Sequence, residues 1–172
     1  MFEAEGGRRE CAGLYTPEQR ARRDSTGWTL VQAVLAPLQF CVFLVSVWLV
    51  VRFLLTGEGY ALATGSIIAK TAVLYLIMIT GCLWEKAVFD QYLFAAPFFW
   101  EDVFSMAVLA LHTAYIAGLI TAALSPRALM LLALAAYASY VINAGQFLLK
   151  LRAARRSSPV LATGVPLPVS QP

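Results

Sequence analysis

The stretch GYALATGSIIAKTAVLYLIMITGCLW, residues 59–84, decides the fold class of this chain. A helix of about 20 apolar residues crosses the hydrocarbon core of a bilayer, and this stretch is longer than that. Its only charged side chain is Lys70. An ammonium group at that depth costs about 2.5 kcal/mol or more, so it normally faces a partner or a hydrated cavity. We therefore expect a polar interior, in which Lys70 is either functional or paired with another internal charge.

Composition places the whole chain in the same class. Of its 172 residues, 60% are hydrophobic and 13% are charged, and its mean hydropathy of +0.71 lies outside the range of soluble domains. Four apolar stretches are long enough to span a membrane, at about 29–51, 60–83, 103–124 and 128–149. The sequence therefore predicts an all-α integral membrane protein with four transmembrane helices in one bundle, over residues 28–151.

The segments on either side of this domain differ from it in composition. Residues 1–27 mix acids and bases and contain no apolar signal-peptide core. Within them, Thr16 is followed by Pro17 and by Gln19 three residues on, a pattern that starts a helix, so we expect a short surface helix here. Residues 152–172 contain Ser-Ser-Pro and Pro-Leu-Pro and are expected to form a disordered tail.

Lysines and arginines predict the orientation in the membrane. The opposite side of the predicted bundle carries only Arg52 and Arg127. The termini and the second loop carry the others: Arg8, Arg9, Arg20, Arg22, Arg23, Lys86, Lys150, Arg152, Arg155 and Arg156. Because cytoplasmic loops are enriched in these residues, both termini and the second loop are expected to be cytoplasmic. The orientation in the membrane thus explains the excess of basic residues behind the net charge of +3, and no nucleic-acid partner is needed to explain it.

Polar residues within the spans recur in helical register. Gln32, Gln39 and Ser46 are seven residues apart on the first span, a drift of about 20° per step. On the third, Glu101, Ser105 and His112 lie within about 40° of one direction; the fourth carries Asn143 and Gln146. These side chains and Lys70 predict one polar interior, open to the cytoplasm. The alternative is that they only bond neighbouring helices, for about 0.6 kcal/mol each.

His112 is the only histidine in the sequence. One chain therefore cannot hold a haem iron between two histidines, which argues against a cytochrome b type redox protein. Three roles stay open for His112: an axial ligand to one magnesium or iron, a proton carrier, or an interhelical hydrogen bond.

The second predicted loop, between Trp84 and Asp102, combines acids with aromatic rings. Glu101 and Asp102 begin the third span near Glu85. Carboxyl groups gathered at an apolar boundary resist being ionised together, so we expect one of them to hold a proton, as proton-transfer catalysis needs. Alternatively, Glu101 and Asp102 only complement the helix dipole. The rings of Trp84, Tyr92 and Trp100 suit either an aromatic belt or a platform for a flat ligand.

Several long segments resemble one enzyme family. They are LYTPEQR (14–20), WTLVQ (28–32), APLQF (36–40), WEKAVF (84–89), QYLFA (91–95), FFWEDVFSM (98–106) and LHTAY (111–115). Together they resemble the vinyl bacteriochlorophyllide hydratase family, and the resemblance covers nearly all of residues 14–151. It implies a small enzyme of bacteriochlorophyll synthesis in the inner membrane of a phototrophic bacterium. Such an enzyme adds water to the C3 vinyl group of a chlorophyllide, giving a 1-hydroxyethyl group, and uses no cofactor.

The chemistry of hydration suggests roles for the residues singled out above. Glu101 is expected to be the general acid, and Asp102 or Glu85 to accept the proton of water. His112 is expected to face the magnesium of the substrate, and Lys70 or Lys86 its propionate carboxylate. The other residues expected at the pigment are Trp84, Tyr92, Trp100, Gln39 and Asn143.

Two other classes of protein share parts of this pattern. A non-catalytic pigment-binding or photosynthetic assembly protein would need the same aromatic rings and histidine, but it would not need acids that titrate. A small proton-coupled transporter would use Lys70, although four spans with no visible repeat are few for that function. Lipid, the magnesium tetrapyrrole and other enzymes of the pigment pathway are the expected partners.

Overall fold

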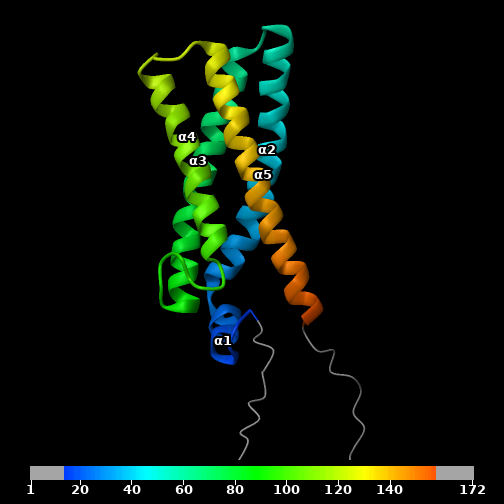
Figure 1. The fold of residues 1–172 in the computed structure, drawn as a ribbon, viewed down its shortest axis with the longest axis vertical. Coiled ribbons are helices and arrows are strands. Elements are labelled where there is room, and N and C mark those ends of the chain that lie inside the picture. The colour runs from blue at the N-terminus through cyan, green and yellow to red at the C-terminus, as the bar shows by residue number, and fades with distance from the viewer. Residues whose placement is uncertain (1–13, 158–172) are drawn as a thin grey trace, which may run out of the picture.

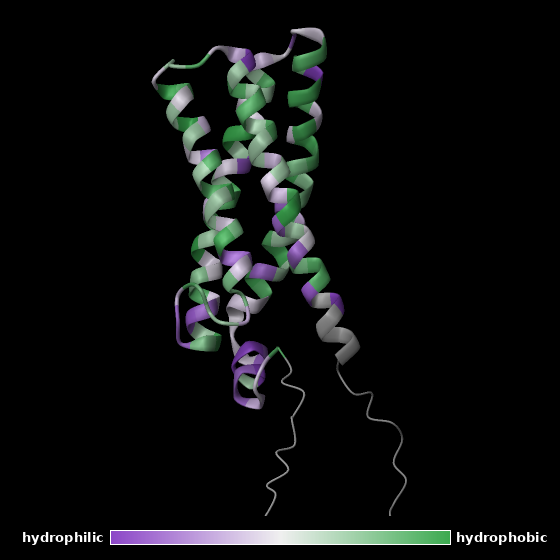
Figure 2. Ribbon diagram, viewed as in Figure 1, coloured by the Kyte–Doolittle hydropathy of each residue, from purple (hydrophilic) through white to green (hydrophobic). Residues whose placement is uncertain are grey.

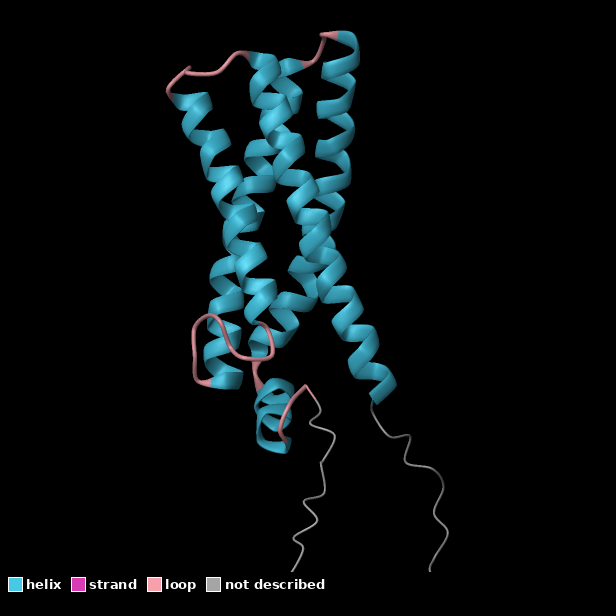
Figure 3. Ribbon diagram, in the orientation of Figure 1, coloured by secondary structure: helices cyan, strands magenta, loops and turns pink. Residues whose placement is uncertain are grey.

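The computed structural model describes residues 14–157, which contain five α-helices and no strand (Figures 1 and 3). The helices are α1 (Pro17–Ser25), α2 (Gly27–Thr56), α3 (Tyr60–Phe89), α4 (Phe99–Ile120) and α5 (Pro126–Ser157). Four of them are long and apolar enough to cross a membrane: α2, α3, α4 and α5 over Pro126–Lys150. Hydrophobic residues follow these four along their length, whereas hydrophilic residues gather on α1 (Figure 2). The prediction of an all-helical membrane protein with four spans is confirmed.

The four long helices form two antiparallel hairpins. α2 packs mainly against α3, and α4 packs mainly against α5, with fewer contacts between the hairpins. α1, the 90–98 loop and the last turns of α5 lie at one end of the bundle, here called the α1 end (Figure 1). The turns at 57–59 and 121–125 lie at the opposite end. The second predicted loop, with its acids and aromatic rings, is therefore at the same end as both described termini.

Local sequence explains how the short connections form. At α1, the Thr16 hydroxyl accepts a hydrogen bond from the Gln19 N–H, and the Gln19 side chain accepts one from the Thr16 N–H. This capping box is the one the sequence predicts. The turn at the opposite end places Gly57 at φ 77° and Gly59 at φ 83°, left-handed conformations that residues with a Cβ rarely adopt. Ser125 caps α5 by accepting a hydrogen bond from the Ala128 N–H at 3.3 Å.

Several helix boundaries differ from those the sequence predicts; α2 and α3, for example, continue to Thr56 and Phe89, past the expected span ends at 51 and 83. The third span was expected at 103–124, but α4 runs from Phe99 to Ile120, four residues earlier at both ends. It ends there because the chain turns at Ala122, whose φ is 51°. The tail was expected to begin at residue 152, but α5 continues to Ser157. Residues 152–156 are alanines and arginines, which are good helix formers. The rest of the predicted tail lies outside the described residues.

The apolar core lies toward the opposite end of the bundle. Val50, Ala63, Ile67, Tyr115 and Met130 are completely or almost completely buried there and belong to one contiguous cluster. The buried polar side chains instead lie on the faces that the helices turn toward one another: Gln39, Ser46, Lys70, Thr71, Thr80, Glu85, Glu101, Asp102, Ser105, His112 and Asn143. The interior is thus polar over much of its length, as the helical register of these residues predicts.

Candidate active site

Two buried carboxyl groups meet at the α1 end. Glu85 lies near the end of α3 and Asp102 in the first turn of α4, and their exposed fractions are 6% and 5%. The backbone N–H groups of the consecutive residues Phe94 and Ala95 bond Asp102 and Glu85, so the two carboxyl groups lie side by side. Carboxyl groups that lie close together and out of water resist being ionised together, which favours a proton on one of them. We call Glu85 and Asp102 the carboxyl pair.

The 90–98 loop holds the carboxyl pair from one side. The backbone N–H of Phe94 donates to Oδ2 of Asp102 at 2.7 Å, and that of Ala95 donates to Oε2 of Glu85 at 3.3 Å. Phe94 adopts a φ of 60°, an uncommon conformation for a residue with a Cβ. Such conformations persist only where the surrounding structure enforces them. The loop is therefore shaped to aim two backbone donors at the pair.

Glu101 lies beside the pair but has a different partner. Its carboxylate forms an ion pair with Lys150 of α5, with Nζ 2.6 Å from Oε1. Lys150 also donates to the carbonyl of Pro97, and its Nζ lies 4.8 Å from the centre of the Phe98 ring. Lys150 thus ties α5 to the start of α4 and to the 90–98 loop. From the sequence, Lys150 is expected only to mark the orientation in the membrane; its positive charge opposite an acid-rich loop is the signal that could have predicted this ion pair.

A second polar group lies deeper in the bundle, around Lys70. The side chain of Lys70 is completely buried, and within residues 14–157 its Nζ has neither a hydrogen-bond partner nor an acidic one. Its Nζ lies 4.2 Å from the ring centre of Tyr140, 5.4 Å from that of Tyr137 and 6.0 Å from that of Phe43. The ring of His112 is 5.9 Å from that of Tyr137. We call these five residues the Lys70 cluster.

His112 presents one ring nitrogen to this interior. Its Nδ1 lies 2.8 Å from the carbonyl oxygen of Val108. Since a carbonyl can only accept, Nδ1 carries the hydrogen, and in the neutral ring Nε2 keeps its lone pair. Nε2 is buried and has no partner among the described residues. An acceptor of that kind suits an axial bond to a metal ion in a ligand.

The other polar residues of the spans divide into two groups. Ser46 bonds both Ser66 and Tyr137, and the Gln32 amide donates to Thr80 at 2.8 Å, so these residues connect helices. The Asn143 amide donates to Ser105 at 2.8 Å, yet its oxygen has no partner in the described chain. Both amide atoms of Gln39 are buried without a partner there. Gln39 and Asn143 therefore keep free hydrogen-bonding capacity for a ligand.

Three of the predicted binding residues around the second loop, Lys86, Tyr92 and Trp100, lie at the surface. Lys86 bonds Asp90 at 2.7 Å, and that hydrogen bond lowers the pKa of Asp90 below its usual range. Tyr92 and Trp100 are 58% and 67% exposed. The indole of Trp84 is half-buried and donates to the Thr29 hydroxyl at 3.0 Å. The Nζ of Lys86 lies 5.5 Å from the centre of the Tyr92 ring, whereas Trp84 packs against Phe98 and Trp100 against Phe99. Two exposed rings at the end of a bundle are typical of an aromatic belt.

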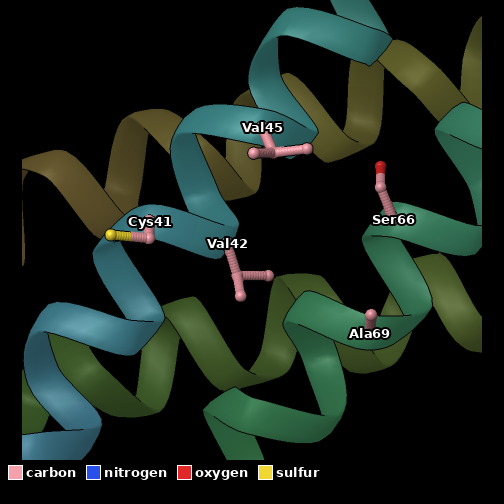
Figure 4. A pocket seen from close by; sticks show the side chains of 5 residues that line it. All are labelled: Cys41, Val42, Val45, Ser66 and Ala69. Carbon is pink, nitrogen blue, oxygen red and sulfur yellow. The ribbon is translucent and has the colours of Figure 1, made fainter.

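A cavity of about 290 Å³ lies on another face, between α2 and α3 (Figure 4). It is lined by Cys41, Val42, Val45, Ser66 and Ala69. Its volume is at the lower limit for a drug-sized ligand, so it is too small for a whole tetrapyrrole. We do not assign the reaction to it.

The carboxyl pair and the Lys70 cluster lie one above the other. Asp102 and His112 are ten residues apart on α4, which corresponds to about 15 Å of helix. One end of the interior thus holds two neighbouring buried acids, and its middle holds a lysine without a partner among the described residues beside a free imidazole nitrogen. This combination is that of a membrane protein with buried groups capable of acid–base chemistry.

Comparisons with known proteins identify the family. Residues 15–153 match the family model described as 2-vinyl bacteriochlorophyllide hydratase. A protein of that name from Cereibacter sphaeroides is 66% identical over 143 residues, which are 83% of this chain and 88% of the relative. One from Rhodobacter capsulatus is 68% identical over 142 residues, which are 83% of this chain and 82% of the relative. No solved structure matches the chain significantly.

The chain belongs to the 2-vinyl bacteriochlorophyllide hydratase family. It is therefore a hydratase of bacteriochlorophyll biosynthesis, which confirms the resemblance and the activity expected from the sequence.

Proposed function

We propose that this chain hydrates the vinyl group of its pigment at the α1 end, with the carboxyl pair as both donor and acceptor of the proton. The observation that supports this proposal is that two buried acids, Glu85 and Asp102, are held side by side by the N–H groups of Ala95 and Phe94. Repulsion between two buried negative charges favours a single proton on the pair. A pair with one proton has both an acid to give and a base to receive, the two functions that hydration needs.

The proposed reaction has two steps. The protonated member of the pair gives its proton to the terminal vinyl carbon, which becomes a methyl group. The positive charge then lies on the carbon attached to the macrocycle, whose conjugation spreads it. Water attacks that carbon through its oxygen, and the proton that it releases passes to the carboxyl pair. The net change is the addition of one water, and the pair again holds one proton.

Glu101 receives a supporting role in this proposal. The sequence alone favours Glu101 as the general acid, but its ion pair with Lys150 makes it the negatively charged partner of a cation. An acid that donates to an alkene must carry a proton, so Glu85 and Asp102 suit the task better. We propose that Glu101 is a positioning residue, because Lys150 also bonds the Pro97 carbonyl and so holds the 90–98 loop over the pair.

The pigment is proposed to stand edgewise in the bundle, along the line from the carboxyl pair to the Lys70 cluster. The free Nε2 of His112 would then face the magnesium of the substrate, about 15 Å of helix from Asp102. The unpartnered amide atoms of Gln39 and Asn143 would face the polar edges of the macrocycle. Trp84 remains a candidate at the mouth, because it packs edge-on against Phe98 next to the pair.

We further propose that the α1 end is the cytoplasmic side of the bacterial inner membrane. Among the described residues, this end carries Arg20, Arg22, Arg23, Lys86, Lys150 and Arg152, and the opposite end carries Arg52 and Arg127. That bias follows the rule that cytoplasmic segments are rich in lysine and arginine. The carboxyl pair would then exchange protons with the cytoplasm.

Amide variants of the carboxyl pair test the proposal. Glu85→Gln and Asp102→Asn each keep the shape of the side chain and remove the shared proton. We expect each to slow turnover of vinyl pigment by about 100- to 10,000-fold, the usual contribution of general acid or base catalysis. Pigment binding, followed by quenching of tryptophan fluorescence, should persist.

The matched control is Glu58→Gln, an exposed acid in the turn at the opposite end, which should leave turnover unchanged. Glu101→Gln should cost less than either variant of the pair. Full turnover in Glu85→Gln and Asp102→Asn would exclude the pair as the proton source, and a larger loss in Glu101→Gln would return that role to Glu101.

A further inference from the structure

Asn143 of α5 has one buried polar atom that no described group contacts. Its amide nitrogen donates to the Ser105 hydroxyl of α4 at 2.8 Å, and this bond fixes the orientation of the amide. The side chain is 9% exposed, and Oδ1 is buried without a partner in residues 14–157. An amide oxygen can only accept hydrogen bonds. The environment of Asn143 is therefore complete only when a ligand donates a hydrogen to Oδ1.

The bond between Asn143 and Ser105 lies slightly deeper in the bundle than the carboxyl pair. Ser105 follows Asp102 by three residues on α4, which corresponds to about 4.5 Å of helix. Ser105 is 7% exposed, and it is the next buried polar residue of α4 after Asp102 in the direction of His112. The free oxygen of Asn143 is thus placed between the carboxyl pair and the Lys70 cluster, along the line proposed for the pigment.

The chemistry of the pigment limits what can donate to Asn143. In a magnesium tetrapyrrole the metal replaces the hydrogens of the ring nitrogens, and carbonyl groups on the ring only accept. Water carries two O–H donors, and a bridging water is almost as favourable as a direct hydrogen bond. Asn143 would therefore face the edge of the macrocycle through a water molecule.

The proposed reaction needs a water at this depth. The carboxyl pair protonates the terminal vinyl carbon, whereas water attacks the carbon attached to the macrocycle. In a pigment that stands edgewise, the second carbon lies deeper than the first. A water that donates one hydrogen to Oδ1 of Asn143 and the other to the ionised member of the pair keeps a lone pair of its oxygen free for that carbon.

We propose that Asn143 binds and orients the attacking water, and that Ser105 is a positioning residue that aims the Asn143 amide. This inference rests on the proposed function, because it takes the carboxyl pair as the group that receives the proton of the water. As the new C–O bond forms, the O–H bond directed at the pair breaks and its proton passes to the carboxylate. Asn143 keeps its hydrogen bond to the oxygen and is itself unchanged.

The test uses membranes that contain the full chain and are given vinyl chlorophyllide. Asn143→Leu keeps the size of the side chain and removes the acceptor, so kcat should fall by about 10- to 100-fold with little change in KM. Ser105→Ala removes a single oxygen and leaves the acceptor in place, so it should cost about fivefold. Hydration makes the attacked carbon a stereocentre. The ratio of its two configurations should move toward even in Asn143→Leu, because water is no longer held on one side.

A second measurement, in deuterium oxide, separates the capture of water from the transfer of the proton. The carboxyl pair of Asn143→Leu still gives deuterium to the terminal vinyl carbon. When no water captures the cation, the pair takes back a hydrogen from the new methyl group. Unreacted pigment should therefore gain deuterium faster than it gains water in Asn143→Leu, and should gain neither with the Glu85→Gln/Asp102→Asn chain.

Gln32→Leu is the matched control, because it also removes an amide that donates across helices at 2.8 Å, to Thr80. It should leave kcat and the ratio of configurations unchanged. A normal rate and a normal ratio in Asn143→Leu would overturn the water site, and so would equal losses in Asn143→Leu and Gln32→Leu. Loss of both hydration and deuterium uptake in Asn143→Leu would also overturn it. Full turnover by Glu85→Gln/Asp102→Asn, with deuterium uptake persisting in Asn143→Leu, would reject only the carboxyl pair.

Discussion

At the scale of single residues, His112 shows how one backbone contact prepares a side chain for binding. The Val108 carbonyl fixes the hydrogen on Nδ1 and so leaves the lone pair on Nε2, which points into an interior where no other described group meets it. Metal-bound histidines are usually oriented in this way, with the second nitrogen donating to a carbonyl or a carboxylate. The same ring, with no contact to Val108, would be free to present either nitrogen.

The account predicts that His112→Ala weakens pigment binding by about tenfold or more, which corresponds to about 1.4 kcal/mol. The visible absorption bands of the bound pigment should change as its magnesium loses an axial ligand. Added imidazole should restore both properties. Tyr115→Phe, which removes another buried polar group of α4, is the control and should leave both unchanged. Unaltered affinity and spectrum in His112→Ala would remove the axial-ligand assignment.

At the scale of elements, the start of α4 and the end of α5 determine the site together. Lys150 joins them through Glu101, across 49 positions of sequence. Helical register identified which faces of the four spans are polar, because a period of 3.6 residues is a local property. It did not reveal the Lys150–Glu101 pair, which depends on how α4 and α5 are placed relative to one another. The sequence did place Glu85 near Glu101 and Asp102, but it did not show which of the two lies beside it. The sequence also predicts the wrong end for α4, because apolar residues continue past the turn at Ala122 and hide the end of the helix.

Removing the ion pair between Lys150 and Glu101 should destabilise the α1 end of the bundle. Lys150→Met leaves the buried Glu101 carboxylate without its cation, and we expect it to lower the free energy of unfolding by about 1 to 3 kcal/mol. That is less than the roughly 3–5 kcal/mol for a fully buried pair, because Lys150 is partly exposed. Thermal unfolding in detergent measures the loss, and Glu101→Gln/Lys150→Met should recover part of it. Lys86→Met breaks an exposed pair and should change stability little. Equal losses in the two lysine variants would contradict the role given to Lys150.

At the scale of the whole molecule, two helical hairpins enclose a polar interior whose two ends have different chemistry. The sequence predicted the four spans and the polar interior, since composition and register are sufficient for both. It also led to the family, because segments such as FFWEDVFSM (98–106) are long and unusual. It gathered the binding residues of the second loop into one site, whereas in the structure Lys86 pairs with Asp90 and lies over the Tyr92 ring, and Trp100 is exposed elsewhere on α4. From the sequence alone, an aromatic residue near the end of a span looks the same whether it belongs to an aromatic belt or to a ligand-binding site.

The most direct test of the account uses the whole chain alone. Membranes from a pigment-free host that expresses this chain are given the free-acid vinyl pigment in water enriched in ¹⁸O, without nucleotide or reductant, and the product is analysed by mass spectrometry. The account predicts a product that has gained one water with its oxygen from the solvent, and none with the Glu85→Gln/Asp102→Asn chain. Pigment that is bound but recovered unchanged from the unaltered chain, or converted equally well by the double variant, would contradict it.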